Sequence, residues 1–217
     1  MEKIVKEFYG NQSVESYEKS HGPRFNFLME DLKLHEIRNS RVADFGCGYG
    51  PIFRRMPTDS GNTYFGFDGA NDGIDPQDVC QYEEVDLNLS FSDWFLDEEG
   101  QVDVAFCFET MEHLTNPYSA LTEIKKILKN DGILYLSIPH QDITHNTIYP
   151  GLLYPVENFK QFLEQMAFEI CDHRIHNKAF VQHVFTLKNK DWNHSKMKWH
   201  KDEDKFRGIP PVVAVNL

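Results

Sequence analysis

Short apolar runs alternate with polar segments along the middle of the chain. The runs cover 41–45, 63–67, 82–85, 102–108 and 132–138. The segments between them carry polar and charged residues at spacings that suit helices. This alternation of strand-like and helix-like segments predicts βαβ units joined into a parallel sheet.

Two helices are marked by apolar stripes. The first covers 117–129: Asn116 is placed to cap it, a proline occupies its first turn, and Asn130, Asp131 and Gly132 end it. The second covers about 156–167 and carries four large apolar residues on one face. Both are predicted to pack one face against the sheet.

The two ends of the chain differ from the central pattern. Residues 1–40 show helical spacing, which Gly22 and Pro23 are expected to interrupt. Runs at 168–176 and 179–187, joined by a turn at Asn177 and Lys178, predict a closing hairpin. We divide the chain into a helical N-terminal cap or lid (1–40), an α/β domain (41–187) and a basic, aromatic C-terminal extension (188–217).

Composition narrows the class of protein. The 217 residues include 22 Lys and Arg against 34 Asp and Glu, a formal charge of −12, which disfavours nucleic acid as a partner. Four widely spaced cysteines form neither a zinc-binding pattern nor a disulfide framework. Without an apolar stretch of about 18 residues, no membrane span is expected, and a cytoplasmic location is predicted.

The most informative stretch is a glycine loop after the first strand. Residues 42–50 run from a buried-strand pattern into Gly46, Gly48 and Gly50. Glycines at alternate positions let the backbone turn sharply and approach a ligand closely. Pro51 occupies the position of the third glycine in the dinucleotide fingerprint, which disfavours a nicotinamide or flavin cofactor.

Acidic residues follow several predicted strands. Asp68 lies 24 residues after Asp44, close to the spacing at which an acid reaches ribose hydroxyls in a βαβ nucleotide site. Asp86 and Glu109 follow the next two strands. In an open parallel sheet these strand ends line one crevice, so the acids are expected to lie together.

Taken together, five motifs resemble those of the class I S-adenosylmethionine-dependent methyltransferases, from about Arg41 to Pro139 and on to Leu187. The motifs cover 42–50, 65–68, 85–87, 108–114 and 128–134. The resemblance implies a Rossmann-like α/β domain with helices on both faces. Its seven-stranded, mostly parallel sheet has the order 3-2-1-4-5-7-6, with the last strand antiparallel.

The resemblance also implies S-adenosylmethionine as the cofactor and S-adenosylhomocysteine as the product. It implies the following contacts: Asp44 and the backbone of Gly46, Cys47, Gly48 and Gly50 around the methionine part, Asp68 and Gly69 at the ribose, Asp86 and Leu87 at the adenine, and Phe108 and Glu109 beside the sulfonium. Tyr17 or Arg24 could meet the cofactor's carboxylate, although a surface helix break explains that segment equally well. The short linker 51–62 and the breaker-rich stretch 69–76 depart from the family pattern and predict short or irregular helices there.

Candidate catalytic groups come from two segments. His140, directly after the fifth strand, is the favoured general base, with His113 and Glu112 as further catalytic candidates. Glu109, Glu112 and His113 also resemble the metal motif of ubiquinone-pathway O-methyltransferases and of small-RNA 3′-terminal 2′-O-methyltransferases. A divalent metal is therefore an alternative, but the favoured assignment has none, because the same motif occurs in metal-free relatives.

The acceptor is less well defined by the sequence. His145, Tyr149 and Tyr154 fall in a loop expected to roof the acceptor pocket. The lysines and aromatic residues of the extension, with Trp199 among them, could grip an anionic acceptor or pack on the domain. We predict methylation of a small-molecule or sugar hydroxyl or amine. The alternatives are metal-dependent methylation of RNA 3′ ends and a catalytically silent, cofactor-binding scaffold.

Overall fold

The computed structural model describes residues 14–69, 78–98, 100–140, 155–176 and 181–191. Its strands form one seven-stranded sheet of order β3-β2-β1-β4-β5-β7-β6. They are β1 (Arg41–Phe45), β2 (Thr63–Asp68), β3 (Gln81–Glu84), β4 (Val102–Cys107), β5 (Leu128–Pro139), β6 (Phe168–His176) and β7 (Gln182–Asn189). The first five strands pair in parallel, and β7 pairs antiparallel with both β5 and β6. The predicted fold class and strand order are confirmed.

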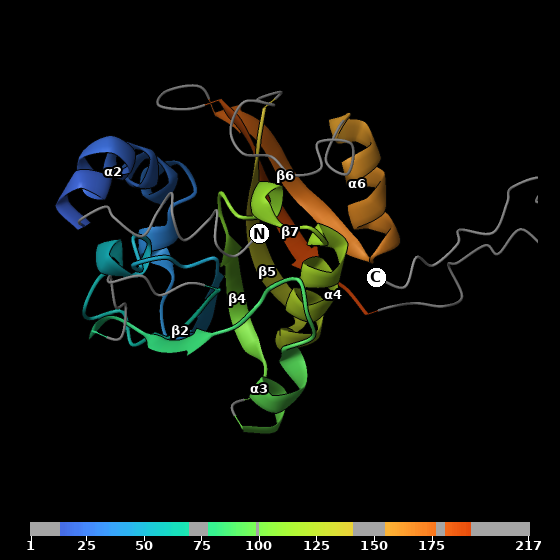
Figure 1. Cartoon of the computed structure of the whole chain (residues 1–217), viewed down its shortest axis with the longest axis horizontal. Helices are drawn as coiled ribbons and strands as arrows, with labels where there is room; N and C mark the ends of the chain where they lie inside the picture. Colours follow the sequence, from blue (N-terminus) through green and yellow to red (C-terminus); the bar gives the residue numbers. More distant parts are fainter. Residues whose placement is uncertain (1–13, 70–77, 99, 141–154, 177–180, 192–217) are drawn as a thin grey trace, which may run out of the picture.

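Helices cover both faces of this sheet (Figure 1). One face packs on α2 (Val14–Asp31), through Phe25, Leu28 and Met29. The other packs on α3 (Ser92–Glu98), α4 (Pro117–Ile127) and α6 (Val156–Gln165). Single 3₁₀ turns form η1 (Leu34–Glu36), η2 (Phe53–Arg55) and η4 (Met111–His113). The turn η2 confirms that the segment after the glycine loop is short and irregular.

The N-terminal helix corrects one prediction. Helix α2 passes through Gly22 and Pro23 without a break. Arg55 stabilises the helix at this point, because its Nη1 donates to the Glu18 carboxylate at 2.9 Å and its Nη2 donates to the Gly22 carbonyl at 3.4 Å. The guanidinium thus binds the helical turn that precedes the proline, and burial of Phe25 fixes the residues that follow it. Tertiary contacts outweigh the helix-breaking tendency of the pair.

Boundaries near β5 also differ from the prediction. The helix expected to reach Lys129 ends at Ile127, because Leu128 is already paired with Val102 in the sheet. The Asn189 side-chain amide donates to the carbonyls of Leu128 at 2.8 Å and Lys129 at 3.1 Å, holding the new strand. Strand β7 lies at 182–189 rather than 179–187, and the residues of the predicted turn lie outside the described part of the chain.

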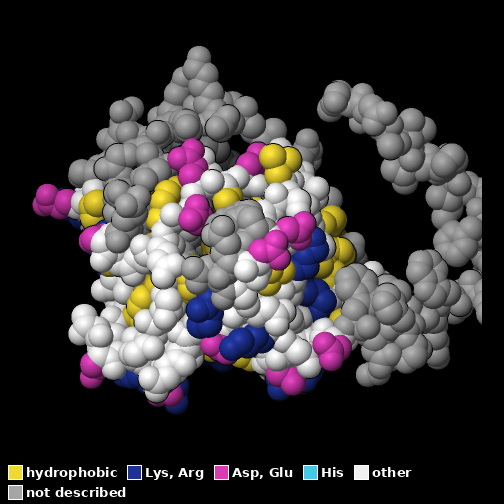
Figure 2. All heavy atoms as spheres, turned by 90° about the horizontal axis from the view of Figure 1, so that it is seen from below, with side chains coloured by type: hydrophobic (Ala, Val, Ile, Leu, Met, Phe, Trp, Pro, Cys, Tyr) yellow, Lys and Arg dark blue, Asp and Glu magenta, His cyan; other side chains and the backbone are white. Residues whose placement is uncertain are grey.

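The surface carries mixed charge. On the face seen in Figure 2, Lys and Arg side chains lie beside Asp and Glu side chains and form no continuous basic stripe. None of the helices that the structure describes is long and apolar enough to cross a membrane. The aromatic and basic positions of 192–217 lie outside the described residues, so the proposed role of the extension stays a prediction.

Candidate active site at the carboxyl edge of the sheet

The glycine loop turns back directly after β1. Gly46, Gly48 and Gly50 have φ angles of 80°, 50° and 75°, which side-chain-bearing residues rarely adopt. The backbone amides of Gly46 and Cys47 donate to the Phe67 carbonyl at 2.7 and 3.2 Å, which ties the loop to β2. A Cβ on Gly48 would meet no atom within 4 Å. At Gly48 the loop therefore presents backbone to open space at the carboxyl edge of the sheet.

Asp68 joins three strand ends. Its Oδ2 accepts a hydrogen bond from the Gly48 amide at 2.8 Å, and its backbone carbonyl accepts one from Val85, just beyond β3, at 2.9 Å. A Cβ on the following Gly69 would lie in van der Waals contact with the Val85 carbonyl, at 3.4 Å. A carboxylate offers about four lone-pair sites, and Asp68 can hold the loop and still accept hydrogen bonds from a ligand.

Asp44 is the buried acid of the site. Its residue is only 3% exposed, and burial, together with the negative charge of Asp68, raises the pKa of its carboxyl group to about 7. A cationic ligand group placed nearby would favour the ionised form. Burial also raises the pKa of the Cys47 thiol, which stays protonated and fills the space beside Gly66. Cys47 thus contributes packing and backbone rather than a reactive thiolate.

The turn after β3 places the next pair of predicted residues. Asp86 accepts hydrogen bonds from the backbone and side-chain amides of Asn88 at 2.9 and 2.8 Å. The Asn88 side-chain oxygen accepts in turn from the amides of Thr115 at 2.8 Å and Asn116 at 3.0 Å. Leu87 between them is buried. The turn is therefore fixed against the segment that follows η4, at the same edge as Asp68.

Glu109 lies just beyond β4 in a left-handed conformation, with φ 54°. Its amide donates to the Ser137 hydroxyl of β5 at 3.0 Å, and its carboxylate forms an ion pair with Arg24 of α2. Burial raises the pKa of Glu109, and the charge of Arg24 and the Ser137 hydroxyl oppose that rise. Arg24 thus reaches the predicted site, bound to a protein carboxylate. Tyr17 packs edge-on against Tyr49, with ring centroids 5.1 Å apart.

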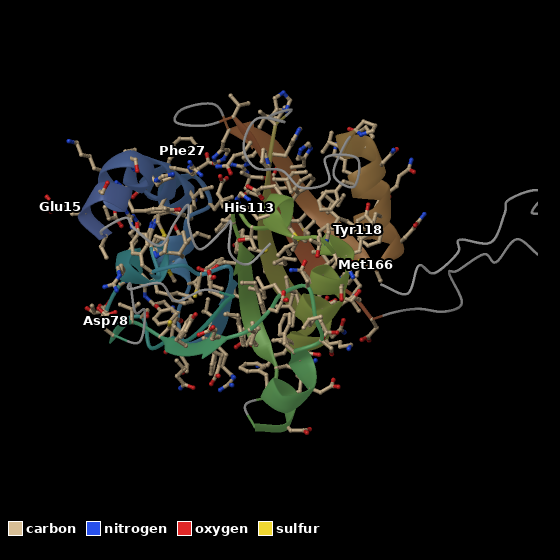
Figure 3. The ribbon with its side chains drawn as sticks, viewed as in Figure 1. Glu15, Phe27, Asp78, His113, Tyr118 and Met166 are labelled. Carbon is tan, nitrogen blue, oxygen red and sulfur yellow. The ribbon has the colours of Figure 1, made fainter. Side chains whose placement is uncertain are left out.

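Glu112 and His113 form the 3₁₀ turn after Glu109. Figure 3 shows His113 near the centre of the molecule, at the end of β4. The Glu112 side chain is 0% exposed, and neither of its carboxylate oxygens has a hydrogen-bond partner. Burial and the charge of Glu109 raise the pKa of Glu112 well above its usual range. His113 Nε2 lies 3.9 Å from Glu112 Oε1, and Phe108 is buried against Phe106.

The three side chains do not form a metal site by their own geometry. Within the described residues, no group of three or more His, Cys, Asp or Glu side chains is arranged to hold a metal ion. The carboxylate of Glu109 points to Arg24 instead. The alternative of a divalent metal therefore rests on Glu112 alone, whose buried oxygens have no donor.

His140 follows β5 at the same edge. Its amide donates to the Val181 carbonyl at 2.9 Å, and its Nδ1 shares a hydrogen bond with His183 Nε2 at 2.8 Å. His140 is three residues beyond Ser137, which contacts Glu109. In an extended strand that separation corresponds to about 10 Å. The predicted acceptor-loop residues His145, Tyr149 and Tyr154 lie outside the described residues.

Sequence reasoning missed Ser137, His173 and His183. Ser137 sits in an apolar strand with no local signal. The two histidines fall on the two strands of the predicted hairpin, at positions whose pairing depends on the exact register. The presence of histidines on both strands of the predicted hairpin was a signal that they could lie close together. Their contact could not be predicted, because the turn alone does not fix the register of the two strands.

The arrangement suits the predicted cofactor. The exposed backbone of Gly48 and the carboxylates of Asp44 and Asp68 lie at one edge of the sheet, where carboxylates can bind a ligand with hydroxyl and cationic groups. An imidazole at the end of β5 can accept a proton. These residues fit S-adenosylmethionine, because the space over Gly48 is open and Asp44 is a buried carboxylate near Asp68, which holds the Gly48 amide.

Comparison with known proteins places this geometry in a family. A model of the family described as "Methyltransferase domain" matches residues 24–209. The ubiquinone biosynthesis O-methyltransferase of Glaesserella parasuis is 27% identical over 150 residues, which cover 58% of this chain and 63% of that protein. The enzyme of the same name from Vibrio parahaemolyticus is 25% identical over 127 residues, 55% of this chain and 52% of that protein. The chain thus spans about half to two thirds of these curated relatives.

Solved structures share the fold. The 1,6-didemethyltoxoflavin-N1-methyltransferase of Burkholderia thailandensis, with bound S-adenosylhomocysteine, superimposes with a TM-score of 0.60 at 17% identity over 87% of this chain and 86% of that one. An S-adenosylmethionine-dependent methyltransferase from Aquifex aeolicus gives a TM-score of 0.58 at 15% identity, covering 87% and 98%. The family match over most of the chain and the strand order agree, and the chain belongs to the class I S-adenosylmethionine-dependent methyltransferase family.

Proposed function

We propose that this protein transfers a methyl group from S-adenosylmethionine to a hydroxyl or amine of a small molecule, with a sugar among the candidate acceptors. One observation carries the proposal: Asp68 holds the Gly48 amide at 2.8 Å while the space over that glycine stays open. The names of the relatives support a small acceptor, since they describe ubiquinone biosynthesis and toxoflavin methylation. The charge of −12 also favours a small acceptor over nucleic acid.

Each end of the cofactor has candidate partners in this chain. Asp44 and the loop backbone at Gly46, Cys47, Gly48 and Gly50 would hold the methionine part. Asp68 and Gly69 would hold the ribose, and Asp86 and Leu87 the adenine. Phe108 and Glu109 would border the sulfonium. When bound, S-adenosylmethionine supplies an electrophilic methyl group on a good leaving group, so that holding the acceptor close and aligned contributes much of the rate.

The protein's own contribution to chemistry is to position the acceptor and remove its proton. His140 Nε2 is the ring nitrogen that does not take part in the bond to His183, and it is the proposed base. Glu112, whose pKa is raised by burial and by the charge of Glu109, is the further candidate for handling the acceptor's proton, and His113 beside it would help to orient that group. A hydroxyl acceptor needs the base more than an amine does, because a neutral amine already has a free electron pair.

The test is transfer of labelled methyl from S-adenosylmethionine into a cell extract separated by size. Parallel samples receive RNase, magnesium or a chelator. Label in small, RNase-resistant material is the expected result, and it should fall at least about 100-fold in His140→Gln. Tight cofactor binding with no labelled product from any extract would instead support a cofactor-binding scaffold.

A second candidate follows from Glu112. Its two buried oxygens without hydrogen-bond partners would accept a divalent cation, with Glu109 and His113 nearby. Binding would require Glu109 to leave Arg24. Label in RNase-sensitive material that disappears with chelator would support metal-dependent methylation of RNA ends and overturn the small-molecule proposal.

A further inference from the structure

Three histidines form a continuous hydrogen-bonded row on the last three strands of the sheet. His140 Nδ1 lies 2.8 Å from His183 Nε2, and His183 Nδ1 lies 2.9 Å from His173 Nε2. The row crosses from the end of β5 over β7 to β6, at the outer side of the sheet. The two ring nitrogens of His183 bond to different histidines on opposite sides of its ring. The three side chains therefore form a linear chain of hydrogen bonds and do not surround a single point.

The surroundings make this row directional. His183 is 3% exposed, whereas His140 and His173 are half-buried. The His173 ring stacks on Phe185, with centroids 4.4 Å apart and planes 12° from parallel, so its orientation is fixed. One end lies at the proposed acceptor site, and the other lies at the edge strand, where water can reach it.

We propose that His140, His183 and His173 form a proton relay that carries the acceptor's proton from the active site to solvent at the sheet edge. The inference rests on the proposed methyl transfer and assigns its proton a route. His183 is a positioning and relay residue, since it does not touch the acceptor.

The proton balance is simple. Transfer replaces the acceptor's O–H or N–H bond with a bond to methyl, leaves the cofactor as a neutral thioether and releases one proton. His140 Nε2 takes that proton while its Nδ1 proton passes to His183 Nε2. The Nδ1 proton of His183 passes to His173 Nε2, and His173 Nδ1 gives its proton to water. Each turnover leaves the three rings in the opposite tautomer, and the starting tautomers return after the product leaves, when His140 Nε2 gives its proton to water, the shifts run back and water protonates His173 Nδ1. No oxidant or further reactant is required.

Charges around the centre of the relay keep it neutral at rest. Burial, the neighbouring imidazoles of His140 and His173, and Lys160 of α6 lower the pKa of His183 to about 4, while Glu157 of α6 acts in the opposite direction. A neutral imidazole has one donor and one acceptor nitrogen, as the row requires. Burial and Lys160 also lower the pKa of His173, opposed by Glu157 and Asp172, so a proton that reaches it is released readily.

The first test needs no acceptor. Relaxation dispersion of the ring nitrogens in ¹⁵N-histidine-labelled protein reports exchange of His183 between its two tautomers. The relay predicts such exchange in the wild type and its loss in His173→Phe, which keeps the stacking on Phe185. A single static tautomer of His183 in the wild type would overturn the proposal.

The second test uses the acceptor fraction found with labelled S-adenosylmethionine. The rate of single-turnover methyl transfer in His173→Phe should fall about tenfold at low buffer concentration. It should recover as imidazole buffer is added, because imidazole in solution can accept the proton that His173 would otherwise pass to water. His183→Gln should also lower the rate, because its amide keeps one donor and one acceptor for the hydrogen bonds but cannot pass a proton on. The matched control is His35→Phe in η1, before β1 and outside the proposed site, with unchanged rates expected.

The outcomes separate the relay from the proposed function. A normal rate in His173→Phe at every buffer concentration would refute the relay and leave methyl transfer intact. Absence of methyl transfer in the wild type would refute the proposed function, and the nitrogen relaxation would still show whether protons move along the row.

Discussion

The two halves of the sheet build the site in different ways. In the half formed by β1, β2 and β4, the site consists of strand ends and the few residues after them, joined by contacts such as that of Asp68 with Gly48. In the half formed by β5, β7 and β6, the histidines lie 43 and 10 positions apart in the chain. The first half, which we call the cofactor half because the proposed cofactor contacts lie there, is built from residues that are close to one another at the strand ends. The second, which we call the histidine half, is brought together by strand pairing.

This difference implies different sensitivities. The cofactor half depends on glycines in left-handed conformations and on a buried acid, where one added atom or charge has a large effect. The histidine half depends on hydrogen bonds between side chains, which contribute about 1 kcal/mol each. Substitutions should therefore cost most near the glycine loop and least at the edge strand.

Gly46→Ala should have the largest destabilising effect. A Cβ at this position would lie 2.0 Å from Thr110 Oγ1 and 2.9 Å from Thr110 Cβ, in a residue with φ 80°. Thr110 cannot give way, because its hydroxyl donates to the carbonyls of Phe45 and Phe108. We expect the free energy of unfolding to fall by about 3 kcal/mol or more in urea denaturation. A loss below about 1 kcal/mol would show that the β1–β4 junction is loosely packed.

Asp44→Asn should change stability in the opposite direction. Because folding raises the pKa of Asp44 from 3.8 to about 7, the acid form is favoured in the fold, and stability falls as pH rises between those values. Removing the charge should stabilise the protein by up to about 4 kcal/mol at pH 7 and by little at pH 3.5. Denaturation across this pH range measures the difference.

The same variant sharpens the comparison through binding. Calorimetric titration with S-adenosylmethionine should show weaker affinity in Asp44→Asn despite its greater stability. Equal stability of both proteins at pH 7 would contradict the buried-charge explanation. Asp103→Asn, at the opposite end of the sheet beside Arg41 and Lys129, is the control expected to leave affinity unchanged.

The placement of the glycine loop and the acids after the strands at one edge of the sheet could largely be predicted from the sequence. Gly46, Asp68 and Asp86 lie within short motifs whose geometry follows from a strand end and a turn, so their placement needs only the correct strand assignment. The continuity of α2 through Pro23 could not be predicted, because it depends on Arg55, 32 positions away. The His140–His183 pair was equally hidden, since it depends on the register of two antiparallel strands.

Gly48→Ala tests the cofactor half without a packing clash. Gly48 and Gly100 both have positive φ, 50° and 75°, and a Cβ on either would meet no atom within 4 Å. Each substitution should therefore cost about 1 kcal/mol of stability from backbone strain alone. Only Gly48→Ala should also weaken S-adenosylmethionine binding, by about tenfold or more, because its methyl group enters the space proposed for the ligand. Equal affinities of the two variants for S-adenosylmethionine would contradict the proposal that the glycine loop lies in the binding site.

Asp31→Asn should have the smallest effect, at the far side of the sheet. The Asp31 carboxylate accepts from Arg174 at 2.9 Å and pairs with His176 Nε2 at 2.8 Å, which ties the end of α2 to β6. Arg174 is 42% exposed, so solvent screens that pair. An asparagine oxygen can still accept from His176, and the loss should be about 0.5–1 kcal/mol in urea denaturation, with cofactor affinity unchanged. Asp59→Asn, on an exposed turn, is the control with no expected loss. A loss above about 2 kcal/mol in Asp31→Asn would mean that side-chain contacts at the edge strand matter as much as the glycine loop, and the contrast between the two halves would fail.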